Sequence, residues 1–245
     1  MKVCYNITSK CNRNCRYCFK FNREDLTLEE NEKVLDNLFK LGVKKISWTG
    51  GEPFLYKDLP HLLKKSKEYG IINSVNTNLT TVNVDNLEEK IQNVDRLIIS
   101  LDFIYDDFNE KYGIGKDYYA HVSKLLKKIK KINPDIILQL NTVLFNGNIG
   151  FMDEFYEEIC QYDIDHWKII RFLPIRGKAY EEKDNLSITD EQFNEFTRNF
   201  KNRKQNFKII IHGLKEMERK HIIVLSSGKL IYSENGKDEE IKSLI

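Results

Sequence analysis

The sequence predicts an α/β fold in which six strand–helix units form a partial (β/α)6 barrel of the TIM type, followed by a small C-terminal α+β appendage. Strand and helix patterns alternate about six times over residues 1 to about 175, as in a parallel sheet with right-handed crossovers. The 245 residues are enough for one such barrel domain. After Pro174 the alternation stops. We therefore expect a barrel over residues 1–175 and an extension packed on it over residues 176–245.

The predicted strands are short runs rich in apolar and β-branched residues. They cover residues 3–8, 44–49, 71–77, 96–101, 136–144 and 167–173. Apolar residues at helical spacing follow the first five strands, at residues 34–39, 59–69, 84–92, 122–129 and 151–159. Thr27 and Glu30 form a capping-box pattern before the first helix, and Gly42 and Gly70 end the first two.

The residues after the barrel do not continue the strand–helix alternation. Residues 176–185 are charged and are expected to form a loop, and residues 187–200 a helix. Residues 207–211 and 221–232 are expected to be strands, the second of which turns at residues 226–229.

Composition excludes several classes of protein. Charged residues make up 31% of the chain but nearly cancel, leaving a formal net charge of +2, so a duplex nucleic acid partner is not expected. No run approaches the roughly 18 apolar residues of a membrane span, and the N-terminus shows no signal peptide. These features predict a cytoplasmic protein that does not enter a membrane.

Three of the five cysteines fall within eight positions, as Cys11, Cys15 and Cys18. This spacing is a poor disulfide framework, but three thiolates can hold a cubane iron–sulfur cluster and leave its fourth iron open for a cofactor or substrate. The alternative is structural zinc, which needs four ligands, usually in two separated pairs. No second Cys-x-x-Cys exists, although a zinc ion could recruit another side chain in the fold.

The pattern Cys-x-x-x-Cys-x-aromatic-Cys, followed after the next strand by Gly50-Gly51-Glu52-Pro53, resembles the signature of the radical S-adenosylmethionine (SAM) superfamily. The resemblance implies a [4Fe–4S] cluster on the three cysteines and SAM on its open iron. Reductive cleavage of SAM would yield a radical that abstracts hydrogen from a substrate, with a reductase, flavodoxin or ferredoxin as electron donor. The implied cofactor-binding residues are Tyr17, Gly50, Gly51, Glu52, Asn78, Ser100 and Lys116. Each also has a simpler interpretation as a turn former, a helix cap, loop packing or a solvated side chain.

Within the superfamily the chain is most similar to the viperin and molybdenum-cofactor cyclase branch. The segments that carry this similarity are Asn6-Ile7-Thr8, Cys18-Phe19, His166-Trp167-Lys168 and Arg171-Phe172-Leu173-Pro174. Viperins carry lysine, arginine and arginine where Gln139, His166 and Ile114 stand, and the cyclase carries a second cluster for which this chain lacks the cysteines.

Three interpretations of the function therefore stay open, and the first two differ in the substrate. The first is a nucleotide or another small anionic metabolite, for which the candidate contacts are Lys168, Arg171 and Arg176. The second is a peptide that pairs with the strand at residues 207–211. Outside the enzymes, the chain could be a zinc-binding scaffold.

Overall fold

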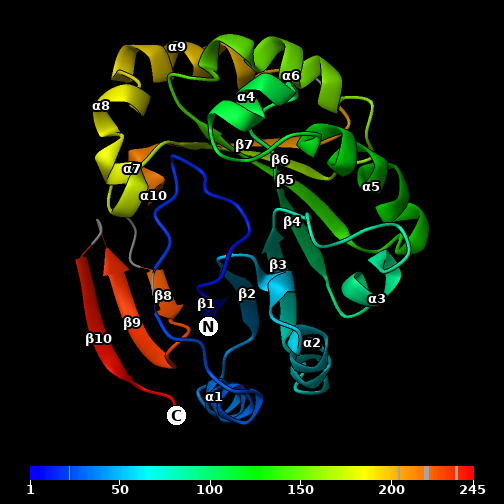
Figure 1. The fold of residues 1–245 in the computed structure, drawn as a ribbon, viewed down its shortest axis with the longest axis vertical. Coiled ribbons are helices and arrows are strands. Elements are labelled where there is room, and N and C mark those ends of the chain that lie inside the picture. Colours follow the sequence, from blue (N-terminus) through cyan, green and yellow to red (C-terminus); the bar gives the residue numbers. More distant parts are fainter. Residues whose placement is uncertain (22, 204, 218–220, 235–236) are drawn as a thin grey trace. The chain divides into compact units, whose positions relative to one another are not determined.

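A computed structural model describes residues 1–21, 23–203, 205–217, 221–234 and 237–245. The chain divides into two compact units (Figure 1). The first contains Met1–Asn12, Lys20–Ile98 and Arg219–Ile245, and the second contains Arg13–Phe19 and Ile99–Glu218. Strand β4 (Arg96–Ser100) carries the chain from the first unit into the second.

The sheet of the first unit is mixed. Strands β1 (Lys2–Thr8), β2 (Lys45–Gly50) and β3 (Ile72–Thr77) are parallel, with Lys2 opposite Lys45 and Lys45 opposite Ile72. On the other side of β1 the sheet continues through β8 (His221–Val224), which is parallel to β1. Strands β9 (Lys229–Glu234) and β10 (Lys237–Ser243) then follow as an antiparallel meander. The helices of this unit are α1 (Leu28–Lys40), α2 (Leu59–Glu68), α3 (Leu87–Ile91) and the 3-10 turn η1 (Pro53–Leu55).

Helix α1 shows how the local sequence determines an element. The Thr27 hydroxyl accepts the Glu30 backbone N–H, and the Glu30 carboxylate accepts the Thr27 N–H, which completes the predicted capping box. Val34, Leu35 and Leu38 lie on one face of the helix and are fully buried.

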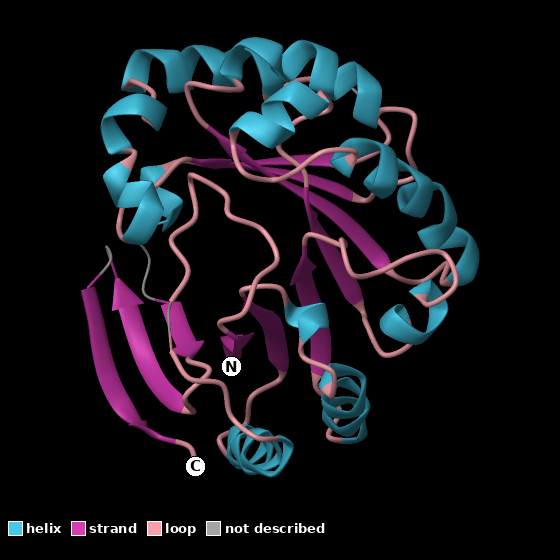
Figure 2. Ribbon diagram, in the orientation of Figure 1, coloured by secondary structure: helices cyan, strands magenta, loops and turns pink. Residues whose placement is uncertain are grey.

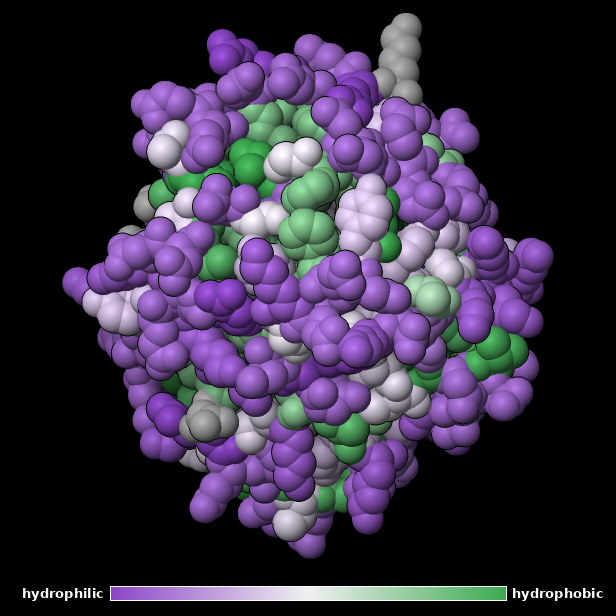
Figure 3. Space-filling model, turned by 45° about the horizontal axis from the view of Figure 1, so that its top comes forward, coloured by the Kyte–Doolittle hydropathy of each residue, from purple (hydrophilic) through white to green (hydrophobic). Residues whose placement is uncertain are grey.

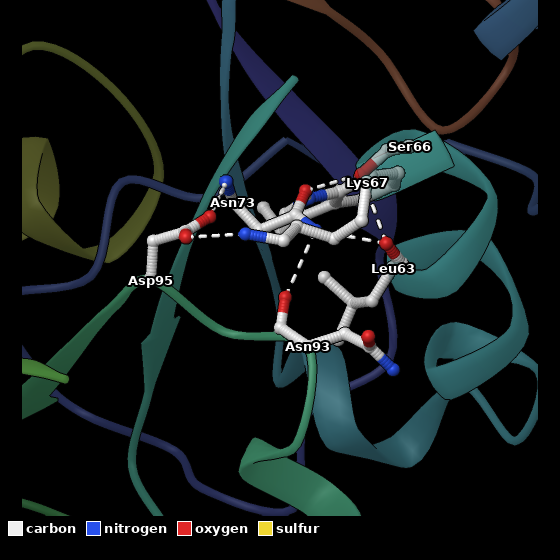
Figure 4. Close-up of polar contacts among 7 residues, drawn as sticks. Leu63, Ser66, Lys67, Asn73, Asn93 and Asp95 are labelled. Atoms are coloured by element: carbon white, nitrogen blue, oxygen red, sulfur yellow. Dashed lines mark hydrogen bonds and ion pairs between the residues drawn. The ribbon is translucent and has the colours of Figure 1, made fainter. Parts of the chain in front are cut away.

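A buried asparagine holds β3, α2 and the start of β4 together (Figure 4). The Asn73 side chain donates to the carbonyl oxygens of Leu63 and Asn93, both at 2.9 Å. Its own oxygen accepts hydrogen bonds from Ser66 and from the Trp48 indole. The Asn73 backbone N–H donates to Asp95, whose carboxylate also pairs with Lys67. This buried amide is therefore fully hydrogen bonded, as a side chain with no exposed surface requires.

The second unit has a parallel sheet of β5 (Ile137–Leu144), β6 (His166–Arg171) and β7 (Lys208–His212). Helices α5, α6 and α9 lie along the same side of these strands (Figures 1 and 2). Phe155 on α6 stacks on Trp167 of β6 with 5.4 Å between ring centroids, and Phe200 of α9 meets the same indole edge-on. The helices of this unit are α4 (Asp106–Lys111), α5 (Tyr118–Ile132), η2 (Ile149–Phe151), α6 (Met152–Ile159), α7 (Gly177–Glu181), α8 (Lys183–Leu186), α9 (Asp190–Phe200) and α10 (Leu214–Met217).

The structure confirms the six predicted strands, the helices between them and the hairpin of β8 and β9. It corrects the expectation of a loop over residues 176–185, which form the short helices α7 and α8. Helices α4 and α10 and strand β10 were not predicted. The division at residue 175 stays a prediction; the two compact units divide the chain differently, since residues 176–218 cluster with the second unit and residues 219–245 with the first.

Among the described residues, no helix is both long enough and apolar enough to cross a membrane. On the face drawn in Figure 3, hydrophilic side chains predominate and apolar ones show as separate patches.

Candidate functional site

The three motif cysteines lie in the segment between β1 and α1. All are half-buried thiols outside any disulfide. The Cys18 N–H donates to the Cys15 carbonyl at 3.2 Å, so a turn joins these two residues. In the described ranges, no three His, Cys, Asp or Glu side chains are grouped as ligands of a single metal ion. A cubane differs from such a site because each thiolate binds its own iron, so its ligands need not meet at one point.

In the first unit, the Gly50-Gly51 pair lets the end of β2 approach the start of the cysteine segment. The Gly51 N–H donates to the Thr8 carbonyl at 2.7 Å, and the Glu52 N–H donates to the Lys10 carbonyl at 2.8 Å. A Cβ on Gly51 would lie 1.9 Å from the Lys10 oxygen, and one on Gly50 would lie 2.2 Å from that of Thr8. The two glycines are therefore required by the chain's own backbone.

The Glu52 carboxylate joins the ends of β2 and β3. It is 1% exposed and accepts the Thr77 hydroxyl at 2.6 Å, the Asn78 N–H at 2.7 Å and the Phe54 N–H at 3.1 Å. Hydrogen bonds from its own chain thus fix the orientation of this predicted cofactor-binding residue. Leu79, just after these residues, has a φ of 58°, an uncommon conformation for a bulky side chain.

Asn78 lies against the first motif cysteine. Its side-chain nitrogen is 3.9 Å from the Cys11 sulfur and 3.2 Å from the Asn12 side-chain oxygen. Its own oxygen accepts the Thr80 N–H at 2.9 Å. Asn78 and Glu52, both predicted to bind the cofactor, are thus neighbours, and Asn78 also contacts Cys11.

In the second unit, Tyr17 is buried and donates from its hydroxyl to Asp102 at 2.6 Å. The other Asp102 oxygen accepts the Val143 N–H, also at 2.6 Å. Burial raises the pKa of Asp102 to about 6, although both hydrogen bonds act to lower it. Burial also raises the pKa of the Tyr17 phenol well above its ordinary value. Ser100 is the residue predicted from this strand end, and Asp102, two residues further along the chain, contacts the cysteine segment through Tyr17.

Two other predicted cofactor residues are exposed. The Ser100 carbonyl accepts the Tyr118 hydroxyl, and residue 100 is exposed. The Lys116 side chain is 70% exposed, and its ammonium lies 3.5 Å from the Glu110 carboxylate. A role for either residue in binding SAM stays a prediction.

Residues of α7, and Glu182 between α7 and α8, contact the cysteine segment. The sequence did not predict these contacts. Arg16 makes a two-pronged ion pair with Glu182, with both nitrogen–oxygen distances at 2.7 Å. Lys178 donates to the Asn14 side chain, and the Ala179 N–H donates to the Cys18 carbonyl at 3.2 Å. The partners are about 160 residues apart in the chain, so no local pattern could have predicted them.

The three substrate-side candidates do not share one surface. Lys168 and Arg171 are an odd number of residues apart on β6, so their side chains leave the strand on opposite faces. Arg171 is engaged by the Asp190 carboxylate at 2.5 Å and the Ile188 carbonyl at 2.7 Å. Arg176 precedes α7 as its N-cap residue. Of the three, Lys168 alone lies on the face that Gln139 and Asn141 share.

Comparison with known proteins identifies the family. Residues 5–162, more than half of the chain, match the radical SAM superfamily. The chain belongs to the radical SAM superfamily. Membership makes it a radical SAM enzyme and implies a [4Fe–4S] cluster and SAM as its cofactors.

Relatives within the superfamily include enzymes named for nucleotide chemistry. An S-adenosylmethionine-dependent nucleotide dehydratase from Flammeovirga pacifica is 25% identical over 96% of this chain and 83% of its own length. A probable GTP 3',8-cyclase from Methanocaldococcus jannaschii is 30% identical over 85% of this chain and 72% of its own length.

Solved structures share the mixed α/β fold of this chain, which is consistent with a partial TIM-type barrel. Native anSMEcpe with bound AdoMet superposes with a TM-score of 0.76 at 17% identity, covering 99% of this chain and 77% of that one. Streptococcus suis SuiB bound to precursor peptide SuiA gives a TM-score of 0.75 at 18% identity, covering 94% and 58%. The chain thus spans less than two thirds of SuiB, and at these identities the likeness concerns the fold alone.

Proposed function

We propose that this radical SAM enzyme acts on a nucleotide or another small anionic metabolite. The cluster would bind Cys11, Cys15 and Cys18, and SAM would lie near Glu52 and Asn78. When bound, the cluster supplies the electron for reductive cleavage of SAM, after which hydrogen is taken from the substrate in this superfamily. Five thiols outside any disulfide fit a reducing compartment such as the cytoplasm, with a reductase, flavodoxin or ferredoxin as electron donor.

One polar face of the second unit's sheet is the observation that supports an anionic substrate. Gln139 lies opposite His166, and Asn141 opposite Lys168, so alternation puts all four on the same face. The other face carries the buried residues Leu138, Leu140, Trp167 and Ile169, which pack under the helices. Two amides, an imidazole and an ammonium group suit a phosphorylated or otherwise anionic substrate better than an apolar one.

Cluster binding is tested by anaerobic reconstitution with Cys15→Ala and the control Cys160→Ala, which removes an exposed thiol outside the motif. The wild type and the control should each take up about four irons and four sulfides and absorb near ~400 nm, and Cys15→Ala should lose SAM cleavage while keeping its fold. Bound zinc without visible absorbance would favour the scaffold interpretation instead.

The substrate class is tested by measuring 5′-deoxyadenosine formed from SAM in the presence of nucleotides or of peptides. We expect nucleotides to stimulate 5′-deoxyadenosine formation, and Lys168→Met to raise the KM for the nucleotide about tenfold or more. Lys128→Met, at an exposed position of α5, should leave the KM unchanged. Stimulation by a peptide encoded beside this gene, with no response to nucleotides, would instead support a peptide-modifying enzyme. The fold shared with peptide-bound SuiB makes that the second candidate.

A further inference from the structure

A buried tyrosine–aspartate pair connects the cysteine segment to the strand ends of the second unit. Tyr17 is next to Cys18 and two residues after Cys15. It is 9% exposed, its ring lies 5.2 Å from that of Phe145, and its hydroxyl meets Asp102, which is 3% exposed. The hydroxyl therefore has a fixed partner in the protein interior.

Asp102 is itself held in place from several directions. One carboxylate oxygen accepts the Val143 N–H, and the Asp102 carbonyl accepts the side-chain nitrogen of Asn148 at 3.3 Å. The same Asn148 nitrogen donates to the Val143 carbonyl at 2.7 Å, and Asn148 has no exposed surface. Hydrogen bonds from Val143 and Asn148, at and after the end of β5, thus hold Asp102 in place independently of Tyr17.

We propose that Asp102 is a positioning residue of the cluster-binding segment, acting through Tyr17 on the backbone that carries Cys15 and Cys18. Partners that orient ligands behind a metal site commonly change its affinity when they are removed. The proposal rests on the proposed cluster. It differs from a direct cofactor contact, because the carboxylate is occupied by Tyr17 and by main-chain N–H.

The Tyr17 hydroxyl and the Val143 N–H donate to different oxygens of the Asp102 carboxylate. In Asp102→Asn one of these two positions becomes an NH2 group, so when the amide oxygen keeps the Val143 N–H, the Tyr17 hydroxyl can no longer donate to this side chain. Tyr17→Phe removes the hydroxyl alone and leaves the ring packed on Phe145. Matched controls are Asp106→Asn and Tyr180→Phe, whose side chains are exposed. Thermal unfolding of every apoprotein shows which variants fold. If Asp102→Asn does not fold, Tyr17→Phe still tests the pair.

The measurements are the rate of iron release to a chelator from the reconstituted protein and the EPR spectrum and midpoint potential of the reduced cluster. We expect each single variant to release iron about tenfold faster, with altered spectra, and the double variant to be no faster than either one, because the pair acts as a unit. The two controls should match the wild type.

The outcomes separate this inference from the function it rests on. If the wild type takes up no iron and sulfide, both are overturned. If all proteins take up the cluster and the variants release iron at the wild-type rate, the role of Asp102 alone is overturned. A double variant about a hundredfold faster would show two independent effects and would also overturn the pair.

Discussion

The contact between Gly51 and Lys10 is the tightest point between β2 and the start of the cysteine segment. A Cβ at this position would lie 1.9 Å from a main-chain oxygen, which cannot rotate away as a side chain can. We predict that Gly51→Ala destabilises the protein by ~3 kcal/mol, measured by denaturant unfolding. Gly150→Ala is the matched control, because no atom beyond its adjacent residues lies within 4 Å of its added Cβ, and it should change stability by less than ~0.5 kcal/mol. Equal effects of the two variants would contradict the predicted clash.

Glu52 offers a second test at the scale of a single residue. Glu52→Gln keeps the shape but puts an amide nitrogen where one carboxylate oxygen accepts either the Asn78 N–H or the Thr77 hydroxyl. Because a buried donor loses its acceptor, we predict a loss of ~1–3 kcal/mol in unfolding free energy and weaker SAM binding by calorimetry. Unchanged stability would show that these hydrogen bonds contribute little.

The sequence predicted part of the candidate site because its motifs are local. Glu52 and Asn78 follow predicted strands, so the parallel pattern alone put them at neighbouring strand ends. The contact of Asp102 with Tyr17 was not predicted, since Ser100 and Asp102 stand at the same strand end and no spacing rule tells which one faces the cysteine segment. The ion pair of Arg171 with Asp190 was not predicted, because Asp190 lies in a helix whose position depends on the tertiary fold, and a role of Arg171 toward the substrate stays a prediction.

At the scale of elements, α7 and α8 are stabilised by their contact with the cysteine segment. Hydrogen bonds from Arg16 lower the pKa of Glu182 from 4.5 to about 2. A lowered carboxyl pKa means that the stabilising contribution is complete above the unfolded value and is lost as the pH falls from about 4.5 towards 2.

We therefore predict that Glu182→Gln lowers the unfolding free energy by ~0.5–1 kcal/mol at pH 7, a modest figure because both side chains are partly exposed. The difference from wild type should shrink at pH 3. Glu181→Gln, at the last residue of α7 and next to Glu182 in the chain, is the control for a change of charge. A difference that is constant from pH 7 to pH 3 would contradict the ion pair.

Elements with a periodic apolar face were predictable, and those without one were not. Helix α1 buries a regular stripe beneath a capping box, and both features are visible in the sequence. Helices α7 and α8 have five and four residues, too few for a periodic pattern. Strand β10 is exposed at all seven positions and pairs with β9 through its backbone, so it has no alternation to detect.

For the whole molecule, the last residues belong to the sheet of the first unit. Strand β8 pairs with the central strand β1, placing Ile223 opposite Cys4 and Val224 opposite Tyr5. We predict that ending the chain after residue 218 gives an aggregating protein. The truncation leaves the β8 side of β1 unpaired and removes the buried residues Leu230 and Ile231. Ending it after residue 234 keeps β8 and β9 and should lower the Tm by roughly 5–10 °C. A folded, monomeric protein ending at residue 218 would contradict this prediction.

The outermost strand of that sheet has a consequence for handling the protein at high concentration. Along β10 the side chains of Lys237, Asp238, Glu239, Glu240 and Lys242 are all exposed, although such a border could otherwise recruit a strand from a neighbouring molecule. The hydration of these charged side chains should oppose edge-to-edge pairing into fibres. Replacing these charged residues with threonine or valine should turn β10 into an aggregation-prone edge strand.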